Sequence, residues 1–173
     1  MFFKKFFYKK INSTNDTAIK KIKQNIKAGI IVTIDQKKGR GQHGRKWISQ
    51  RGNLLTSVFF QINKKISLKK VTKINFLILK NLLMELIKRK ITIKLPNDLL
   101  LNKKKICGIL QETIFYDGNK YIIIGIGINL VKNPIIKKYQ ITNILKETGI
   151  KIQILKLVKL IEKKYKNKIK QFA

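Results

Sequence analysis

The spacing of apolar residues divides the chain into segments with the period of a helix and segments with the composition of a strand. Behind the polar run Ser-Thr-Asn-Asp at 13–16, apolar residues at helical spacing predict a first helix that ends at Gly29. The same period predicts a long second helix from Ser67 to Arg89 and a third helix in the last third of the chain. The helical part of the fold therefore consists of three predicted segments.

Runs rich in β-branched and aromatic residues predict the strands between these helices. They lie at 6–11, 30–35, 53–62, 91–95, 106–116 and 120–130. Pro96 ends the fourth strand, and Asp117-Gly118 is typical of a hairpin turn between the last two. This order of elements predicts an α+β fold with a mixed, mostly antiparallel sheet and helices packed mainly on one side.

Length and composition predict a single globular domain that spans all 173 residues, of which 44% are hydrophobic. No apolar run approaches the roughly 20 residues that a membrane helix requires, so no membrane association is expected. The one cysteine, Cys107, excludes an internal disulfide and fits a cytoplasmic location. Because Cys107 lies in an apolar strand, we expect a small core residue and not a nucleophile.

The formal net charge of +32 is the strongest argument for a nucleic-acid partner. Its distribution argues against one, because the lysines are spread along the whole chain without interleaved aromatic residues. Lys, Ile and Asn, which have AT-rich codons, are abundant, whereas Ala and Pro, which have GC-rich codons, are scarce. This bias indicates that most of the positive charge reflects an AT-rich coding sequence. DNA binding is therefore not expected, although a basic nucleic-acid-binding protein stays the alternative from a different functional class.

The stretch GRGQHGRKW at 39–47 spells the G-x-G-x-x-G pattern of a dinucleotide-binding loop. That motif requires a helix directly behind the glycines and an acidic residue about 20 positions later, and neither is present here. Glycines still allow close approach to a ligand, Arg40 and Arg45 can bind phosphate or carboxylate, and Trp47 can stack on a base. His43, the only histidine, is expected to be exposed and not to bind a metal.

A second group of motifs gives this loop a context. STN at 13–15, Gln36, GRGQHGRKW, KLPND at 94–98, the lysine-x-x-GIL motif at 105–110 and GIGIN at 125–129 follow one another along the chain. In order and spacing this set resembles the biotin protein ligases over residues 6–130. Each motif is weak alone, but the set is specific. The arginine- and glycine-rich signature of the related lipoate ligases is missing.

The resemblance implies the fold of the biotin and lipoate ligases, which is similar to class II synthetases. It implies a two-step ligase reaction in which biotin and ATP with Mg²⁺ form biotinyl-5′-AMP, after which biotin passes to a lysine of a carrier. The implied partner is the biotin carboxyl carrier domain of acetyl-CoA carboxylase. A ligase of the same fold that uses lipoate or octanoate is the second alternative.

The resemblance also implies a role for each motif residue. The biotin site would comprise Ser13, Thr14, Asn15, Gln36, Arg40, Gly41, Gln42 and Lys105. The ATP and adenylate site would comprise Arg40, Arg45, Trp47 and Asn129, with Asn129 on the adenine edge. Lys105 and Arg40 would be catalytic, with Lys105 between the biotin carboxylate and the α-phosphate. Asp98 and Gly108 would support the site, with Mg²⁺ brought by ATP near Asp98 and no dedicated metal site.

Each assignment has a simpler structural interpretation. Lys105 ends a run of three lysines that could be solvated, Ser13 or Thr14 could only cap a helix, and Asp98 could only be a turn residue.

The sequence departs from the family pattern in two motifs and, we expect, in domain content. Gln42 stands where many biotin ligases have arginine, so we expect weaker retention of the adenylate, and Leu95 replaces the usual tryptophan. We expect neither an N-terminal helix-turn-helix nor a C-terminal β-barrel domain. The sequence leaves open whether the protein is a monomer or a homodimer.

Overall fold

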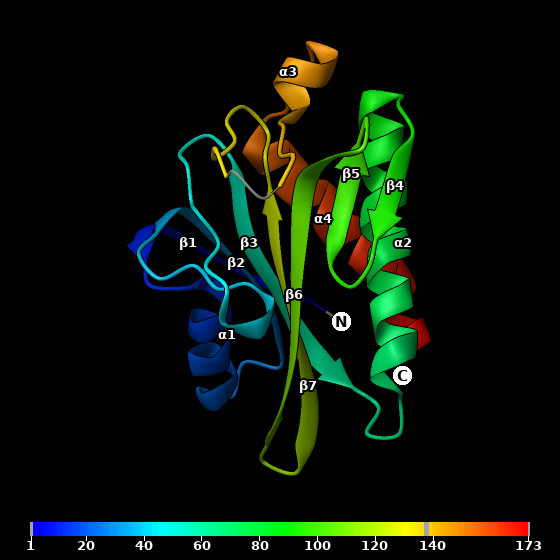
Figure 1. Ribbon diagram of the computed structural model, residues 1–173. Helices are drawn as coiled ribbons and strands as arrows, with labels where there is room; N and C mark the ends of the chain where they lie inside the picture. The colour runs from blue at the N-terminus through cyan, green and yellow to red at the C-terminus, as the bar shows by residue number, and fades with distance from the viewer. Residues whose placement is uncertain (1, 137–138, 173) are drawn as a thin grey trace.

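The computed structural model describes residues 2–136 and 139–172, which form one seven-stranded sheet with helices on both faces. The strands lie in the order β1-β2-β3-β7-β6-β5-β4 (Figure 1). Their bounds are Lys4–Ile11 (β1), Ala28–Gln36 (β2), Leu54–Ile62 (β3), Ile91–Lys94 (β4), Asp98–Leu101 (β5), Lys104–Tyr116 (β6) and Asn119–Ile128 (β7). β1 and β2 are parallel and the other neighbours are antiparallel, which confirms the mixed, mostly antiparallel sheet.

The helices divide unequally between the two faces of the sheet (Figure 1). They span Thr14–Lys23 (α1), Leu68–Ile87 (α2), Ile144–Thr148 (α3) and Ile154–Lys168 (α4), with 3-10 turns at Gln42–Gly44 (η1) and Ile169–Phe172 (η2). The large core joins α2 and α4 to one face, as predicted. α1 packs on the opposite face through Ala18 and Ile22, which contact Ile31, Phe59 and Ile123 in a smaller cluster.

Alternation along β7 explains why the two faces differ. The even-numbered isoleucines from 122 to 128 all point into the large core under α2 and α4. The odd-numbered positions begin with Tyr121 and Ile123 beneath α1 and continue with Gly125 and Gly127. Because glycine has no side chain to fill this face, the part of the sheet beyond α1 is left open for a pocket.

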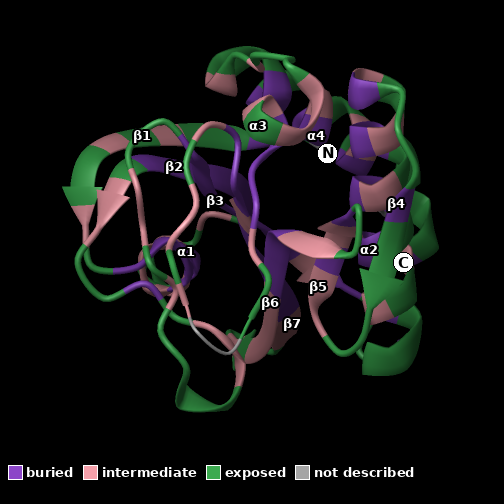
Figure 2. Ribbon diagram, turned by 45° about the horizontal axis from the view of Figure 1, so that its top comes forward, coloured by how far each residue is buried: buried purple, intermediate pink, exposed green. Residues whose placement is uncertain are grey.

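Burial follows this layering (Figure 2). The inner strands β3 and β7 are buried along almost their whole length, because helices cover them and side chains such as Trp47 and Asn15 lie over the glycines of β7. The edge strand β4 is buried only at Ile91. In the part of the chain that the structure describes, no helix combines the length and the apolar character needed to cross a membrane.

The structure corrects three details of the sequence analysis. α1 ends at Lys23, and Gly29 lies inside β2 instead of ending the helix. A Cβ at Gly29 would lie 2.6 Å from the ring of Phe59, so the glycine serves close packing on the sheet and not helix termination. The strand β5 and the short helix α3 were not predicted, because four and five residues carry too little periodicity to be recognised.

Candidate functional site

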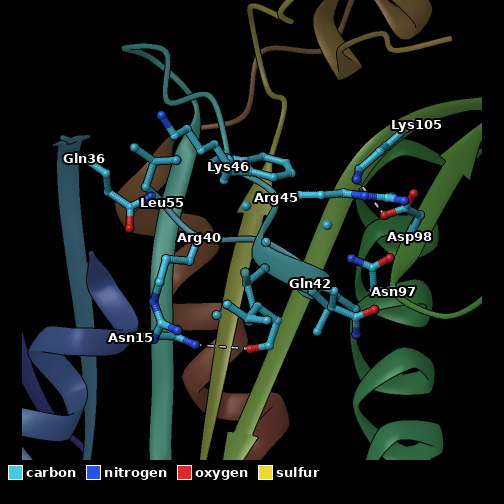
Figure 3. A pocket seen from close by; sticks show the side chains of 18 of the residues that line it. Asn15, Gln36, Arg40, Gln42, Arg45, Lys46, Leu55, Asn97, Asp98 and Lys105 are labelled. Carbon is cyan, nitrogen blue, oxygen red and sulfur yellow. Dashed lines mark hydrogen bonds and ion pairs between the residues drawn. The ribbon is translucent and has the colours of Figure 1, made fainter. Parts of the chain in front are cut away.

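A pocket of about 430 Å³ lies on the open face of the sheet, between the N-terminus of α1 and the loop 39–47. The structure brings twelve of the thirteen residues singled out from the sequence into its wall: Ser13, Thr14, Asn15, Gln36, Arg40, Gly41, Gln42, Arg45, Trp47, Asp98, Lys105 and Gly108. Figure 3 shows Asn15, Gln36 and Arg40 at one end, whereas Lys105 and Asp98 face each other at the opposite end. Residues that are distant in sequence thus form one site.

Glycines of β6 and β7 form the floor of the pocket. The indole of Trp47 lies on Gly108 and Gly127, where a Cβ at Gly108 would come within 2.6 Å of the ring. The side chain of Asn15 lies over Gly125, whose Cβ would be 2.5 Å from Asn15 Oδ1. Any larger residue at these positions would displace a pocket side chain, so the glycines determine the depth of the site.

The loop 39–47 forms a closed hairpin over the pocket. The amide of Gly41 donates to the carbonyl of Arg45 at 2.7 Å, and the amide of Trp47 donates to the carbonyl of Gly39 at 2.9 Å. Between these bonds η1 makes a single turn, in which His43 has a positive φ of 53°. No α-helix begins behind the glycines, so this loop lacks the anion-binding helix N-terminus of a dinucleotide fold, as expected from the sequence.

The guanidinium of Arg40 is held by two carboxylates. Arg40 Nη1 and Nη2 donate to Glu112 Oε1 and Oε2, both at 2.8 Å, and Nη2 lies 2.8 Å from Asp16 Oδ1. Burial lowers the pKa of Arg40, but hydrogen bonds and charges from Glu112 and Asp16 outweigh it and raise the pKa above its ordinary value. Arg40, which the resemblance assigned to phosphate oxygens, therefore links the loop to α1 and β6 while it lines the pocket.

The polar run at the start of α1 has both structural and site contacts. Ser13 Oγ accepts from the amide of Asp16 at 3.3 Å, so Ser13 is the N-cap of the helix. Thr14 donates its amide and its hydroxyl to Gln36 Oε1 at 2.8 and 3.1 Å. Gln36 Nε2 in turn donates to Ser49 Oγ at 3.3 Å. These bonds fix the polar end of the pocket to β2.

Asn15 is almost completely buried, and its amide is oriented by partners on two strands. Asn15 Nδ2 donates to Glu112 Oε2 at 2.6 Å and to the carbonyl of Leu110 at 3.4 Å. Asn15 Oδ1 accepts from Ser57 Oγ at 2.5 Å. Glu112 and Ser57 were not identified from the sequence. A usable signal for Glu112 was its rarity, since the chain has only eight acidic residues.

At the other end of the pocket, Lys105 Nζ lies 2.6 Å from Asp98 Oδ1 and 5.5 Å from the centroid of the Trp47 ring. Its neighbour Lys104 points elsewhere and pairs with Glu147 at 3.4 Å. Lys105 is only about one-fifth exposed, with a side-chain relative accessibility of 22%. The lysine run is therefore not uniformly solvated, and Lys105 is the member that faces the pocket.

The segment 139–142 closes the wall beside Lys105. The amide of Lys105 donates to the carbonyl of Gln140 at 2.9 Å, and the amide of Thr142 donates to the carbonyl of Lys105 at 3.0 Å. The guanidinium carbon of Arg45 lies 5.7 Å from the ring of Tyr139, a cation–π contact that joins this segment to the loop 39–47. Tyr139 was not predicted, because no pattern in the sequence connects it to the loop.

Asn129 is the predicted site residue that the structure does not bring to the pocket. It is 1% exposed, and its Nδ2 donates to the carbonyl of Thr142 at 3.1 Å. Its Oδ1 accepts from Asn53 Nδ2 at 3.5 Å. Since both ends of the amide are used inside the protein, Asn129 anchors the segment behind Lys105 and lies outside the pocket wall.

Metal-binding and nucleophilic groups are scarce among the described residues. In residues 2–136 and 139–172 no three His, Cys, Asp or Glu side chains gather into a metal site. His43 is exposed in the loop, as expected. Burial raises the pKa of the Cys107 thiol to about 12, so Cys107 is a protonated core residue, as its apolar strand predicted, and not a nucleophile.

The fold and the pocket define an α+β domain with a pocket that runs from a polar end at α1 to a cationic end at Lys105. A family model described as the Biotin/lipoate A/B protein ligase family matches residues 7–129. The chain belongs to this family, which confirms the resemblance drawn from its motifs.

Named relatives agree with this membership. The chain is 34% identical over 152 residues to "Bifunctional ligase/repressor BirA" of Escherichia coli K12, covering 82% of this chain and 46% of the relative. It is 31% identical over 127 residues to "Biotin--[acetyl-CoA-carboxylase] ligase" of Paracoccus denitrificans, covering 71% and 53%. The chain thus spans about half the length of the curated relatives it matches.

The fold also matches a solved structure of this kind. The biotin protein ligase from Aquifex aeolicus in complex with biotin and ATP superimposes with a TM-score of 0.82 at 27% identity. The match covers 99% of this chain and 72% of that chain.

Proposed function

We propose that this chain is the catalytic domain of an ATP-dependent biotin protein ligase. A carboxylate oxygen of biotin attacks the α-phosphorus of ATP, forming biotinyl-5′-AMP and releasing pyrophosphate. A lysine amine of a biotin carboxyl carrier domain then attacks the acyl carbon, forming an amide and releasing AMP and a proton. The observation that carries the proposal is one pocket that joins a polar end at α1 to the cationic end at Lys105.

The polar end suits the ureido ring of biotin, which has two N–H donors and one carbonyl acceptor. In the proposal Asn15 offers its side-chain oxygen to an N–H of the ring, and Thr14 and Gln36, which hydrogen-bond to each other, line the same end of the pocket. The apolar floor with Trp47 suits the bicyclic ring and the aliphatic chain, because it is flat and free of charge. Gly41 and Gln42 cover the ligand from the loop 39–47.

The cationic end suits the reacting groups. Lys105, held in place by Asp98, offers an ammonium group where the negative charges of the biotin carboxylate and the α-phosphate meet. Arg45 adds a second positive charge for phosphate oxygens, because it lines the pocket and pairs with no carboxylate among the described residues. Arg40 acts through the loop in this scheme, since its guanidinium is already paired.

Mg²⁺ would accompany ATP in the proposed reaction. It normally keeps several waters and binds through one or two carboxylates together with substrate phosphates. Asp98 is the carboxylate among the described residues that line the pocket, so it is the residue that would hold the ion. When bound, Mg²⁺ would offset part of the charge of the triphosphate.

The proposed partner is the carrier domain of acetyl-CoA carboxylase, in line with the name of the Paracoccus denitrificans relative. The proposed location is the cytoplasm, and the single buried free cysteine fits a reducing compartment.

The test measures ATP–pyrophosphate exchange with biotin and transfer of labelled biotin to a purified carrier domain, with lipoate and octanoate as competitors. Biotin-dependent exchange and labelling of one carrier lysine are expected. ATP–pyrophosphate exchange that depends on lipoate and not on biotin would show that the chain is a lipoate ligase. Salt-sensitive DNA binding without any exchange would contradict a ligase function.

Lys105→Ala should lower the rate of adenylate formation by roughly 100-fold or more, because it removes the ammonium group that faces the pocket. Lys103→Ala is the matched control, since it removes an exposed lysine from the same run and should leave the rate unchanged. A Lys105→Ala enzyme that exchanges pyrophosphate at the unaltered rate would show that this assignment is wrong.

A further inference from the structure

Four polar side chains connect the glycine-rich loop to the floor of the pocket. Arg40 on the loop makes a bidentate pair with Glu112 on β6 at 2.8 Å. Glu112 Oε2 accepts from Asn15 Nδ2 at 2.6 Å, and Asn15 Oδ1 accepts from Ser57 Oγ on β3 at 2.5 Å. This Arg40–Glu112–Asn15–Ser57 chain runs from a partly exposed guanidinium to a serine that is completely buried.

Glu112 determines which way the Asn15 amide faces. An ionised carboxylate can only accept hydrogen bonds, so the NH₂ group of Asn15 must point toward it. The amide oxygen then points toward Ser57 and over Gly125, on the floor of the pocket. One lone pair of that oxygen is left for a donor in the pocket, which matches an N–H of the ureido ring.

The same carboxylate determines where the loop lies. Gly39 and Gly41 on either side of Arg40 are held only by backbone bonds within the hairpin. The Arg40 side chain is therefore the polar link from this part of the loop to the rest of the domain. A bidentate arginine–carboxylate pair fixes both distance and angle, which a single hydrogen bond does not.

The distribution of acidic residues also singles out this arrangement. Glu112 and Asp16 are two of only eight acidic residues in a chain of net charge +32, yet both lie on one arginine at the pocket. Glu112 itself does not line the pocket, so it acts on a ligand only through Asn15 and Arg40.

We infer that Glu112 is a positioning residue that couples the glycine-rich loop to the ureido end of the proposed biotin site. By fixing the Asn15 amide directly and the loop through Arg40, it sets the affinity for biotin more strongly than the affinity for ATP, which it reaches only through the position of the loop. This inference rests on the proposed function, because it takes the pocket ligand to be biotin.

The test compares steady-state constants for Glu112→Gln in the full chain. The substitution keeps the size of the side chain but turns an NH₂ group toward Arg40 or Asn15, where only an acceptor fits. KM for biotin should rise by roughly tenfold or more, as expected for hydrogen bonds to a charged group. KM for ATP and kcat at saturating biotin should change by less than about threefold, and Glu112→Asp should recover part of the loss.

Two controls separate positioning from general stabilisation. Asp16→Asn removes the other carboxylate from Arg40, and the Asp16 side chain makes no hydrogen bond to Asn15. It should therefore raise KM for biotin less than Glu112→Gln does. In a double-mutant cycle, Asn15→Ala and Glu112→Gln should be strongly non-additive in biotin affinity, because both remove the same oriented amide.

The inference is overturned if Glu112→Gln binds biotin like the unaltered chain, or if KM for ATP rises as much as KM for biotin. Additive effects of the two substitutions would also overturn it. These results differ from a failure of the proposed function itself, in which the unaltered chain would bind no biotin, and the inference would fall with it.

Discussion

Gln42 is the residue where the loop differs most from the family pattern and still lines the pocket. Its neighbour Arg40 pairs with two carboxylates, Glu112 and Asp16, which offset its positive charge, so it does not replace an arginine at position 42. The charge available to an adenylate from this loop therefore comes from Arg45 and Lys46, which also line the pocket.

Gln42→Arg should slow the dissociation of biotinyl-5′-AMP by roughly tenfold, because a charge-assisted bond to phosphate is stronger than a neutral one. Single-turnover release of labelled adenylate measures this rate. His43→Arg adds the same charge one position along and should have a smaller effect, since His43 is exposed. Faster release from Gln42→Arg than from the unaltered chain would contradict the expectation.

At the scale of elements, the pocket depends on the alternation of β6 and β7. The odd positions of β7 change from aromatic and apolar residues under α1 to Gly125 and Gly127 under the ligand pocket. These glycines are needed because they have no side chain, which leaves space for Trp47 and Asn15 on the sheet, and less because their backbone is flexible.

Gly127→Ala should destabilise the fold by about 1–3 kcal/mol, because the new methyl group would collide with the indole of Trp47. Since Trp47 is the only tryptophan, its fluorescence reports directly on the displacement and should shift. In a Trp47→Ala background the same glycine substitution should cost much less. An equal cost in both backgrounds would show that the collision is not the cause.

Glu162 links α4 to β1 by an ion pair and makes the stability of their packing depend on pH. Its side chain is 9% exposed and pairs with Lys5 at 2.8 Å and with Lys166 at 2.7 Å. Burial raises the pKa of Glu162, but the hydrogen bonds and charges of Lys166 and Lys5 outweigh it, so the pKa lies below its ordinary value of 4.5. A lowered folded-state pKa stabilises the protein above pH 4.5, and this stability is lost as the pH falls through the folded-state value.

Glu162→Gln should therefore lower the free energy of unfolding by about 1–3 kcal/mol at pH 7 and by a smaller amount at a pH below 4.5. Urea unfolding at the two pH values measures the difference. Glu85→Gln is the matched control, because Glu85 is 57% exposed in its pair with Lys164 and should contribute little. A Glu162→Gln effect that is the same at both pH values would contradict the ion-pair explanation.

On the scale of the whole molecule, positive charge greatly exceeds negative charge. Seven of the eight acidic residues lie within ion-pair distance of a lysine or arginine, yet the chain has 40 such cations. Most of the cations therefore repel one another, which destabilises a compact state.

The midpoint of thermal unfolding should rise by several degrees between about 20 mM and about 500 mM NaCl, because salt screens this repulsion more than it weakens the few ion pairs. Scanning calorimetry at a fixed pH measures the shift. Sucrose at matched osmolality separates screening from solute exclusion. A midpoint that falls with salt would show that the ion pairs outweigh the repulsion.

Local patterns in the amino-acid sequence were enough to predict most elements and most of the site. Helical and strand periods follow from residues close together in the chain, so they predicted six of the seven strands, α1, α2 and α4, and the α+β class. The resemblance of the motif set to the biotin protein ligases likewise singled out twelve residues that line the pocket, although they are as far apart in the chain as Ser13 and Gly108.

The contacts between distant residues depend instead on how the whole chain packs. Arg40 and Glu112 are 72 positions apart and pair because the loop folds over β6, which no local pattern encodes. The amide of Asn129 lies against the carbonyl of Thr142, a contact that no local pattern encodes either. The register and packing of separate strands set these contacts, and the packing of Trp47 and Asn15 on glycines gives the pocket its shape.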